Sequence, residues 1–263
     1  MLRSRVLWLI PVKIALISDI HANLPALERV LADIGGRADI SATYHLGDLV
    51  GYGPWPNEVI ERLATEQIAG VAGNYDSTVA THYKHCGCRY EDPRQEELAH
   101  RSFTWTLDAT SAGAKHALAH LPFRLDIRPL GGHIAGPTLR LMHGNHVLNT
   151  VYVTADRDDD FLRDMAHGTK AREGDIIAFG HTHVPWHRTV DGVLFVNTGS
   201  VGRPKDGDPR AGYVVLEITA AGTAPEFIRL GYDVEKAAKA IEASTLPNEF
   251  AEYLRSGGTR LDA

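Results

Sequence analysis

The alternation of short apolar runs with amphipathic segments in the first third of the chain restricts the fold more than any other feature. The apolar runs predict buried strands at residues 13–18 (KIALIS), 40–48 (ISATYHLGD) and 67–76 (QIAGVAGNYD). The segments between them predict helices at residues 23–35 (NLPALERVLADIG) and 56–66 (PNEVIERLATE). Strand, helix, strand, helix, strand is the order of a largely parallel, right-handed α/β layer.

The second half of the chain has a different pattern. Residues 91–120 are helical in pattern, and after them apolar runs separated by turns predict strands with little helix between them. These runs lie at residues 138–144, 175–183, 193–201, 213–218 and 226–232. No linker rich in proline, glycine or serine divides the two halves. We therefore predict one α/β domain with two packed sheets over residues 13–263.

Both ends of the chain carry additional segments. The first residues combine two arginines with an apolar run, as a signal peptide does, but Pro11 and Lys13 interrupt that run after about seven residues. We expect residues 1–12 to be an N-terminal extension. Two helices from about residue 233, at 234–244 and 248–256, carry apolar stripes that would cover a sheet face or form a subunit interface.

Composition excludes some classes of protein. The net charge is −6, and no basic run exceeds two residues, which argues against a stable nucleic-acid complex or an anionic-membrane binder. No apolar span of about 20 residues predicts a transmembrane helix. The two cysteines, Cys86 and Cys88, are too few for a disulfide framework, so we expect a reducing, cytoplasmic location. Their segment is interpreted as a surface loop, with a substrate lid as the alternative.

Potential metal ligands stand at the ends of five predicted strands. The segments are Asp19-Ile20-His21, Gly47-Asp48, Gly73-Asn74, His143-Gly144 and Gly180-His181-Thr182-His183. In an extended chain, the side chains of residues i and i+2 point to the same side. Asp19 and His21 could therefore converge on one point, and so could His181 and His183. Sites in open α/β folds form at the carboxyl ends of strands.

The ligand inventory indicates more than one metal ion. Two carboxylates, one amide and four imidazoles exceed what a single tetrahedral zinc takes. They suit two ions that share a bridging carboxylate. Nitrogen and oxygen ligands without a thiolate favour Mn, Fe, Zn, Co or Ni over Mg or Ca.

The series DIH, GD, GN, HG and GHTH resembles the calcineurin-like metallophosphoesterase family, and longer runs such as ISDIHANLPALE and NTGSVGRPKDGDPRAGY resemble its bacterial phosphodiesterase branch. The resemblance covers roughly residues 13 to 218 and implies a four-layer α/β/β/α sandwich of two mixed sheets flanked by helices. It also implies seven metal ligands: Asp19, His21 and His183 for the first ion, Asn74, His143 and His181 for the second, and Asp48 between them.

The resemblance implies hydrolysis of a small phosphate ester by a hydroxide that bridges the two metal ions. We expect a phosphodiesterase. A phosphomonoesterase or protein phosphatase and a diadenosine polyphosphate hydrolase are alternatives of the same class. A non-catalytic metal-binding interaction protein is the alternative of another class, because a retromer subunit shares the fold. Each of these functions is compatible with an oligomeric protein.

The sequence departs from the family at the residue after Asn74, where many members have a histidine that serves the leaving group. Here Tyr75 stands in that place. It would be a weak acid, with a pKa near 10, or a packing residue. Asp76 would orient the Asn74 loop or carry out acid–base work. Asn23 would contact a phosphate or cap the following helix, and Arg203 would contact a phosphate or lie in a solvated turn.

Overall fold

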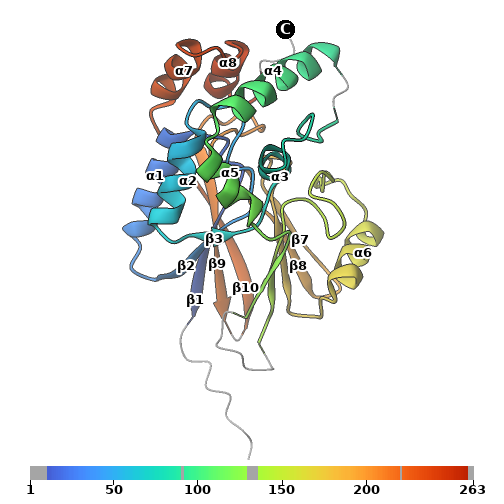
Figure 1. Cartoon of the computed structure of the whole chain (residues 1–263). Helices are drawn as coiled ribbons and strands as arrows, with labels where there is room; N and C mark the ends of the chain where they lie inside the picture. Colours follow the sequence, from blue (N-terminus) through green and yellow to red (C-terminus); the bar gives the residue numbers. More distant parts are fainter. Residues whose placement is uncertain (1–10, 90–91, 129–135, 220, 260–263) are drawn as a thin grey trace, which may run out of the picture.

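Two five-stranded sheets form the centre of the computed structural model, which describes residues 11–89, 92–128, 136–219 and 221–259 (Figure 1). The strand order of the first sheet is β10 (Gly222–Leu230), β9 (Ala211–Thr219), β1 (Val12–Ile17), β2 (Ile40–His45) and β3 (Ala69–Gly70). The order of the second is β4 (Leu125–Ile127), β5 (Leu139–Leu141), β6 (Ile176–Phe179), β8 (Val193–Asn197) and β7 (Trp186–Val190).

Side-chain alternation along β1 explains how the layers pack. Successive side chains of a strand point to opposite faces of its sheet. Ile14 and Leu16 therefore join the apolar cluster that β5, β6, β8 and β9 also enter, which lies between the sheets. Ala15 and Ile17 point the other way and pack against helices.

The helices form the two outer layers. Those that share a core with the first sheet are α1 (Leu24–Gly35), α2 (Pro56–Thr65), α3 (Asn74–Ala80), α4 (Pro93–Ala109), α5 (Ala112–Ala119), α7 (Val234–Glu242) and α8 (Glu249–Arg255). On the far side, α6 (Asp159–Thr169) buries Leu162 and Met165 against the second sheet (Figure 1). The predicted α/β/β/α sandwich is therefore confirmed. The C-terminal helices α7 and α8 pack on each other, α7 also packs on α1, and both join the apolar core of this layer, while their expected cover of a sheet face or role in a subunit interface stays a prediction.

The first sheet is mixed, as expected, because β1 is parallel to β2 and antiparallel to β9. Several sequence-based boundaries were wrong. The strand expected at residues 67–76 shrinks to Ala69–Gly70, because Gly73 caps α3 and turns the chain into that helix. α6 was missed in a region expected to hold little helix. The N-terminal extension was expected over residues 1–12. Residues 1–10 lie outside the described part of the chain, and Val12 is already the first residue of β1.

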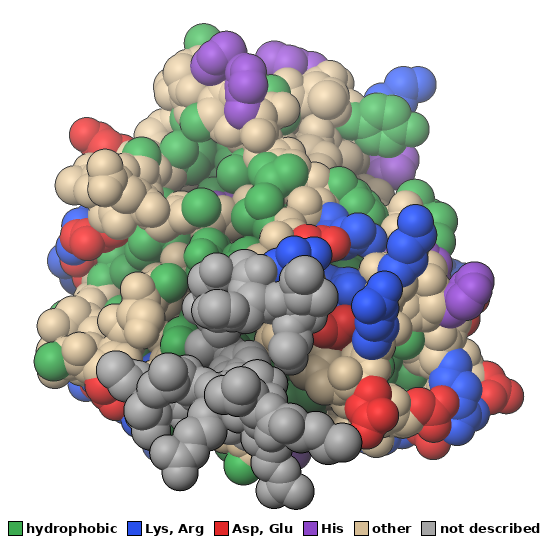
Figure 2. Space-filling view, turned by 90° about the horizontal axis from the view of Figure 1, so that it is seen from below, with side chains coloured by type: hydrophobic (Ala, Val, Ile, Leu, Met, Phe, Trp, Pro, Cys, Tyr) green, Lys and Arg blue, Asp and Glu red, His purple; other side chains and the backbone are tan. Residues whose placement is uncertain are grey.

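No helix in the described ranges is long and apolar enough to cross a membrane. Seen from below in Figure 2, lysine and arginine side chains lie interspersed with aspartate and glutamate on the right of the view. On that part of the face, charges of the two signs are mixed.

Candidate metal centre

The loops that follow β1, β2 and β6 place their polar residues in left-handed backbone. The φ angles are +52° at Asp19, +48° at His21, +53° at Asp48, +67° at His181 and +62° at His183. The extended backbone expected for these pairs was therefore wrong, although Asp19 and His21 do converge on one point. Left-handed backbone costs a non-glycine residue roughly 1–2 kcal/mol, and such strain clusters at functional sites.

Backbone hydrogen bonds between two of these loops hold the strained conformation. The amides of Asp19 and His21 donate to the carbonyls of Gly47 and Asp48, each at 3.0 Å. The pairing of β1 with β2 thus continues past the ends of the strands. It fixes the first two ligand-bearing segments side by side.

Six of the predicted ligands gather in two buried groups. Asp19, His21 and His183 form one group, and Asp48, His143 and His181 form the other; within each, the ligand atoms lie within 4.8 Å of one another.

Asp48 lies between the two groups. Its Oδ2 is 3.4 Å from Nε2 of His143 in its own group and 3.7 Å from Nε2 of His21 in the other. Asp48 is therefore near the imidazoles of both groups.

Asn74 completes the second group from a helix rather than from a strand end. It is the first residue of α3, and its Oδ1 lies 3.1 Å from Nε2 of His143. Its amide nitrogen points away from the centre and donates to the carbonyl of Cys86 at 2.8 Å and to Sγ of Cys88 at 3.3 Å.

Backbone carbonyls orient three of the four imidazoles. Nδ1 of His21 lies 3.0 Å from the carbonyl oxygen of Val50, and Nδ1 of His143 lies 2.7 Å from that of Leu46. Nδ1 of His183 is paired with the carbonyl of Arg203. A donating Nδ1–H directs Nε2 to the centre, which is how metal-binding histidines are normally held.

The donor set fits divalent cations. Oδ1 of Asp19 and Nε2 of His181 are buried and have no hydrogen-bond partner within the described part of the chain. Unpaired buried polar atoms are costly unless a ligand satisfies them.

The imidazole pKa values differ between positions in the centre. Burial and the neighbouring His183 lower the pKa of His21 to about 3, and burial together with His143 lowers that of His181 to about 3. Burial also lowers the pKa of His143, but the Asp48 carboxylate outweighs it and raises the value to about 10. In the metal-free centre, the Asp48 carboxylate therefore favours the protonated form of His143.

Glycine is required where two loops approach the carboxylates. A Cβ atom on Gly73 would lie 2.1 Å from Oδ1 of Asp48, and one on Gly180 would lie 2.4 Å from Oδ2 of Asp19. Both contacts are far shorter than atoms tolerate. A side chain at either position would displace a ligand.

Asp76 links the Asp48 loop to the Asn74 loop. Its fully buried carboxylate accepts hydrogen bonds from the amides of Leu49 and Gly73, both at 2.9 Å. Burial and the nearby Asp48 raise the pKa of Asp76 to about 7. These contacts match the loop-orienting role, whereas an acid–base role stays a prediction.

Tyr75 lies in the aromatic core beside the centre. Its ring contacts those of Tyr52, His21 and Phe103, with centroid distances of 4.9, 5.7 and 5.8 Å. Only 1% of the residue is exposed, and burial raises the pKa of its phenol well above the usual value. This placement supports the packing alternative over the acid role.

The side chain of Asn23 is engaged in structural contacts. Its Nδ2 donates to the carbonyl of Gly202 at 2.8 Å and to the hydroxyl of Tyr232 at 3.0 Å, while Oδ1 caps α1 by accepting from Ala26. The cap alternative therefore describes Asn23, and none of these contacts leaves it directed at a substrate.

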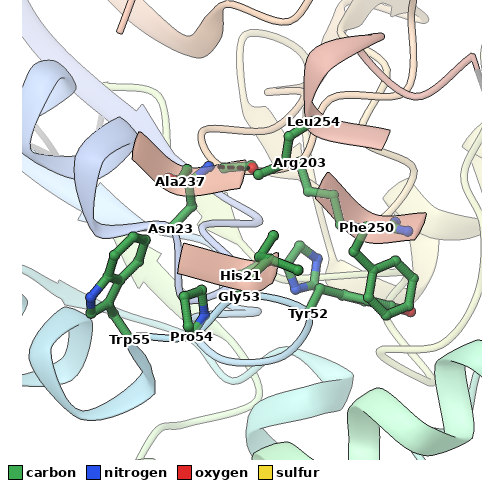
Figure 3. Close-up of a pocket in the computed structure, with 12 residues that line it drawn as sticks. His21, Asn23, Tyr52, Gly53, Pro54, Trp55, Arg203, Ala237, Phe250 and Leu254 are labelled. Atoms are coloured by element: carbon green, nitrogen blue, oxygen red, sulfur yellow. Dashed lines mark hydrogen bonds between the residues drawn. The ribbon is translucent and has the colours of Figure 1, made fainter. Parts of the chain in front are cut away.

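Arg203 is buried at the edge of the centre, not in a solvated turn. Its guanidinium lies between the rings of Tyr52 and Tyr253, 3.9 Å from each centroid. Figure 3 shows Arg203, Asn23 and His21 around a small pocket that Phe250 and other residues of α7 and α8 close. The C-terminal helices thus form a wall of the first metal group.

Two further residues at the second group were not predicted. Cys88 contacts Asn74, and the ring of Tyr152 stacks on His181 with a centroid distance of 4.3 Å. No local pattern signals either contact, because both join segments far apart in the sequence. Sequence reasoning treated Cys88 as part of a surface loop.

The sandwich and its paired aspartate and histidine groups define a metal-binding protein of the two-sheet α/β class. A model of the calcineurin-like phosphoesterase superfamily domain matches residues 12–221. The chain belongs to that superfamily, which makes it a member of a family of phosphoric ester hydrolases.

Similar proteins agree with this assignment. The uncharacterized protein MJ0912 of Methanocaldococcus jannaschii is 31% identical, over 93% of this chain and 98% of that protein. Phosphodiesterase YfcE of Escherichia coli is 26% identical, over 78% of this chain and 87% of the length of YfcE. The crystal structure of a metallophosphoesterase from Sphaerobacter thermophilus is 28% identical, covers 94% of this chain and 99% of its own, and has a TM-score of 0.71.

Proposed function

We propose that the protein is a dinuclear metal-dependent phosphoesterase that hydrolyses phosphodiesters or related phosphate esters and anhydrides of small molecules. The observation that carries the proposal is the position of Asp48 between two buried ligand groups. The ions would be divalent transition metals such as Mn, Fe, Zn, Co or Ni, because the ligands are imidazole nitrogens and carboxylate or amide oxygens.

The chain would hold the two ions with a fixed division of roles. Asp19, His21 and His183 would bind the first ion, and Asn74, His143 and His181 the second, with Asp48 shared. When bound, the metal pair supplies Lewis-acid activation of water and of the phosphoryl group.

Charge complementarity supports a phosphate substrate. Asp19 and Asp48 contribute two negative charges against four positive charges of two divalent ions, which leaves an excess that attracts an anion. The buried setting of these ligands strengthens that attraction, because charges interact more strongly away from water.

Placement of Tyr75 bears on the kind of substrate. Because its phenol is buried in the aromatic core with a raised pKa, it would not replace the histidine that serves the leaving group in many family members. Substrates whose leaving groups depart without protonation, such as aryl diesters and phosphoanhydrides, would then be favoured. The similarity to phosphodiesterase YfcE also favours diesters.

The test compares hydrolysis of bis(p-nitrophenyl) phosphate with that of p-nitrophenyl phosphate by metal-stripped protein reconstituted with Mn, Fe, Ni, Zn, Co or Mg. We expect faster diester cleavage, restored by a transition metal and lost in His181→Ala. His120→Ala, which changes an exposed histidine of the first helical layer, is the matched control and should retain activity. Faster monoester cleavage would move the substrate class to phosphomonoesters. Two bound ions without any hydrolysis would favour a binding protein.

A further inference from the structure

The segment Cys86-Gly87-Cys88 lies against the second ligand group and not on a free surface. Cys86 is 3% exposed, and its sulfur accepts a hydrogen bond from the amide of Cys88 at 3.4 Å. Gly87 has a φ of +81°, which glycine adopts without strain and which turns the segment sharply. The turn brings two hydrogen-bond acceptors to the same side chain, Asn74.

These acceptors determine which end of the Asn74 amide faces the centre. An asparagine side chain can present its oxygen or its nitrogen by rotating half a turn, and only the oxygen can ligate a cation. The carbonyl of Cys86 at 2.8 Å and Sγ of Cys88 at 3.3 Å both accept from Nδ2. In the reversed orientation, the amide oxygen would face the carbonyl oxygen of Cys86, which cannot donate, and the 2.8 Å bond would be lost.

Tyr152 lies on the other side of the second group. Its ring stacks on His181 with a centroid distance of 4.3 Å and an interplanar angle of 25°. His181 is the imidazole for which no backbone carbonyl partner is found among the described residues. The stacking with Tyr152 is therefore a principal constraint on that ring.

We propose that Cys88, with the carbonyl of Cys86, is the positioning element of the second metal site: it keeps the oxygen of Asn74 directed at the centre and thereby sets the affinity of that site for its ion. The inference rests on the proposed metal-dependent function. Cys88 acts here through Asn74 and is not itself a ligand. Residues that orient metal ligands typically change metal affinity 10- to 100-fold when they are replaced.

The experiment is a Co²⁺ titration of the metal-stripped full-length protein, followed by calorimetry and by visible absorption. Cys88→Ala should weaken one of the two Co²⁺ equivalents about tenfold and leave the other unchanged. Cys88→Val should behave in the same way, because valine fills more of the space of the thiol than alanine does but offers no hydrogen-bond acceptor. Cys88→Ser, which keeps an acceptor, should retain most of the affinity. Lys84→Ala is the matched control, because it alters an exposed side chain of the same segment.

Two results would overturn the inference. The first is wild-type affinity for both equivalents in Cys88→Ala and Cys88→Val. The second is a sulfur-to-cobalt charge-transfer band that disappears in Cys88→Ala, because it would make Cys88 a direct ligand. Failure of the proposed function is distinguishable: a wild-type protein that binds two ions but hydrolyses no ester would refute that function, while the affinities of the variants would still decide the role of Cys88.

Discussion

Replacement of Asp76 by alanine should destabilise the metal-free protein strongly, although Asp76 is not one of the proposed ligands. Its carboxylate is fully buried and accepts the amides of Leu49 and Gly73, which belong to different loops. Alanine leaves both donors buried without a partner. Each such loss costs roughly 1–3 kcal/mol, so the expected decrease in unfolding free energy is about 2–6 kcal/mol.

One opposing effect reduces this loss. Burial and the nearby Asp48 carboxylate raise the pKa of Asp76 to about 7, so removing its negative charge relieves repulsion at neutral pH. Asp76→Asn relieves the same repulsion and keeps one acceptor oxygen. It should therefore cost less than Asp76→Ala, about 1–3 kcal/mol for the one donor it leaves unpaired.

The assay is equilibrium unfolding of the metal-free proteins in urea, with metal stoichiometry measured separately. The matched control is Asp39→Ala, which removes an exposed aspartate that pairs with Lys13 at the surface and should change stability little. Both Asp76 variants should also bind metal more weakly, because the Asp48 and Asn74 loops lose a common anchor. Stability of Asp76→Ala equal to that of Asp39→Ala would refute the reasoning.

Three further predictions concern the centre itself. Gly73→Ala should lower metal-dependent hydrolysis about 100-fold by displacing Asp48, whereas Gly113→Ala, which meets no atom within 4 Å, should have no effect; steady-state kinetics of both variants tests this. Tyr75→Phe should leave the rate and its pH profile unchanged, and an altered profile would restore the acid role. Because the pKa of His143 is raised to about 10 in the metal-free centre, a metal must displace its proton, so affinity should increase as pH rises towards 10 and level off above it. Calorimetry in buffers of different ionisation enthalpy should detect about one released proton, and a pH-independent affinity would contradict this assignment.

The sequence predicts the parts of the fold that depend on local periodicity. The early strand–helix alternation and the C-terminal apolar stripes led to β1, β2, α1, α2, α7 and α8. α6 was missed because the apolar residues that it buries belong to one face of a short, otherwise charged segment, residues 158–169. The parallel order expected of the early strands holds for β1, β2 and β3. The antiparallel pairing of β9 with β1 and with β10 had no local signal, because strand partners far apart in the sequence are set by packing.

In the metal centre, too, some features follow from the local sequence and others depend on tertiary packing. Residue type and spacing identified the aspartates and histidines that gather in two groups, because each follows an apolar strand. The left-handed backbone of these residues has no sequence signal, since glycine stands next to several of them rather than at their positions. The contact of Cys88 with Asn74 and the stacking of Tyr253 on Arg203 depend on tertiary structure. They became visible only when distant segments were placed together.

The most direct test of the dinuclear assignment is hydrolysis of bis(p-nitrophenyl) phosphate during stepwise addition of Mn²⁺ to the metal-stripped protein, with bound metal counted at each step. If two ions share Asp48 and act together, activity should remain low through the first bound equivalent and rise to its maximum as the second binds. Full activity after one bound equivalent, or activity in the metal-stripped protein, would contradict the account.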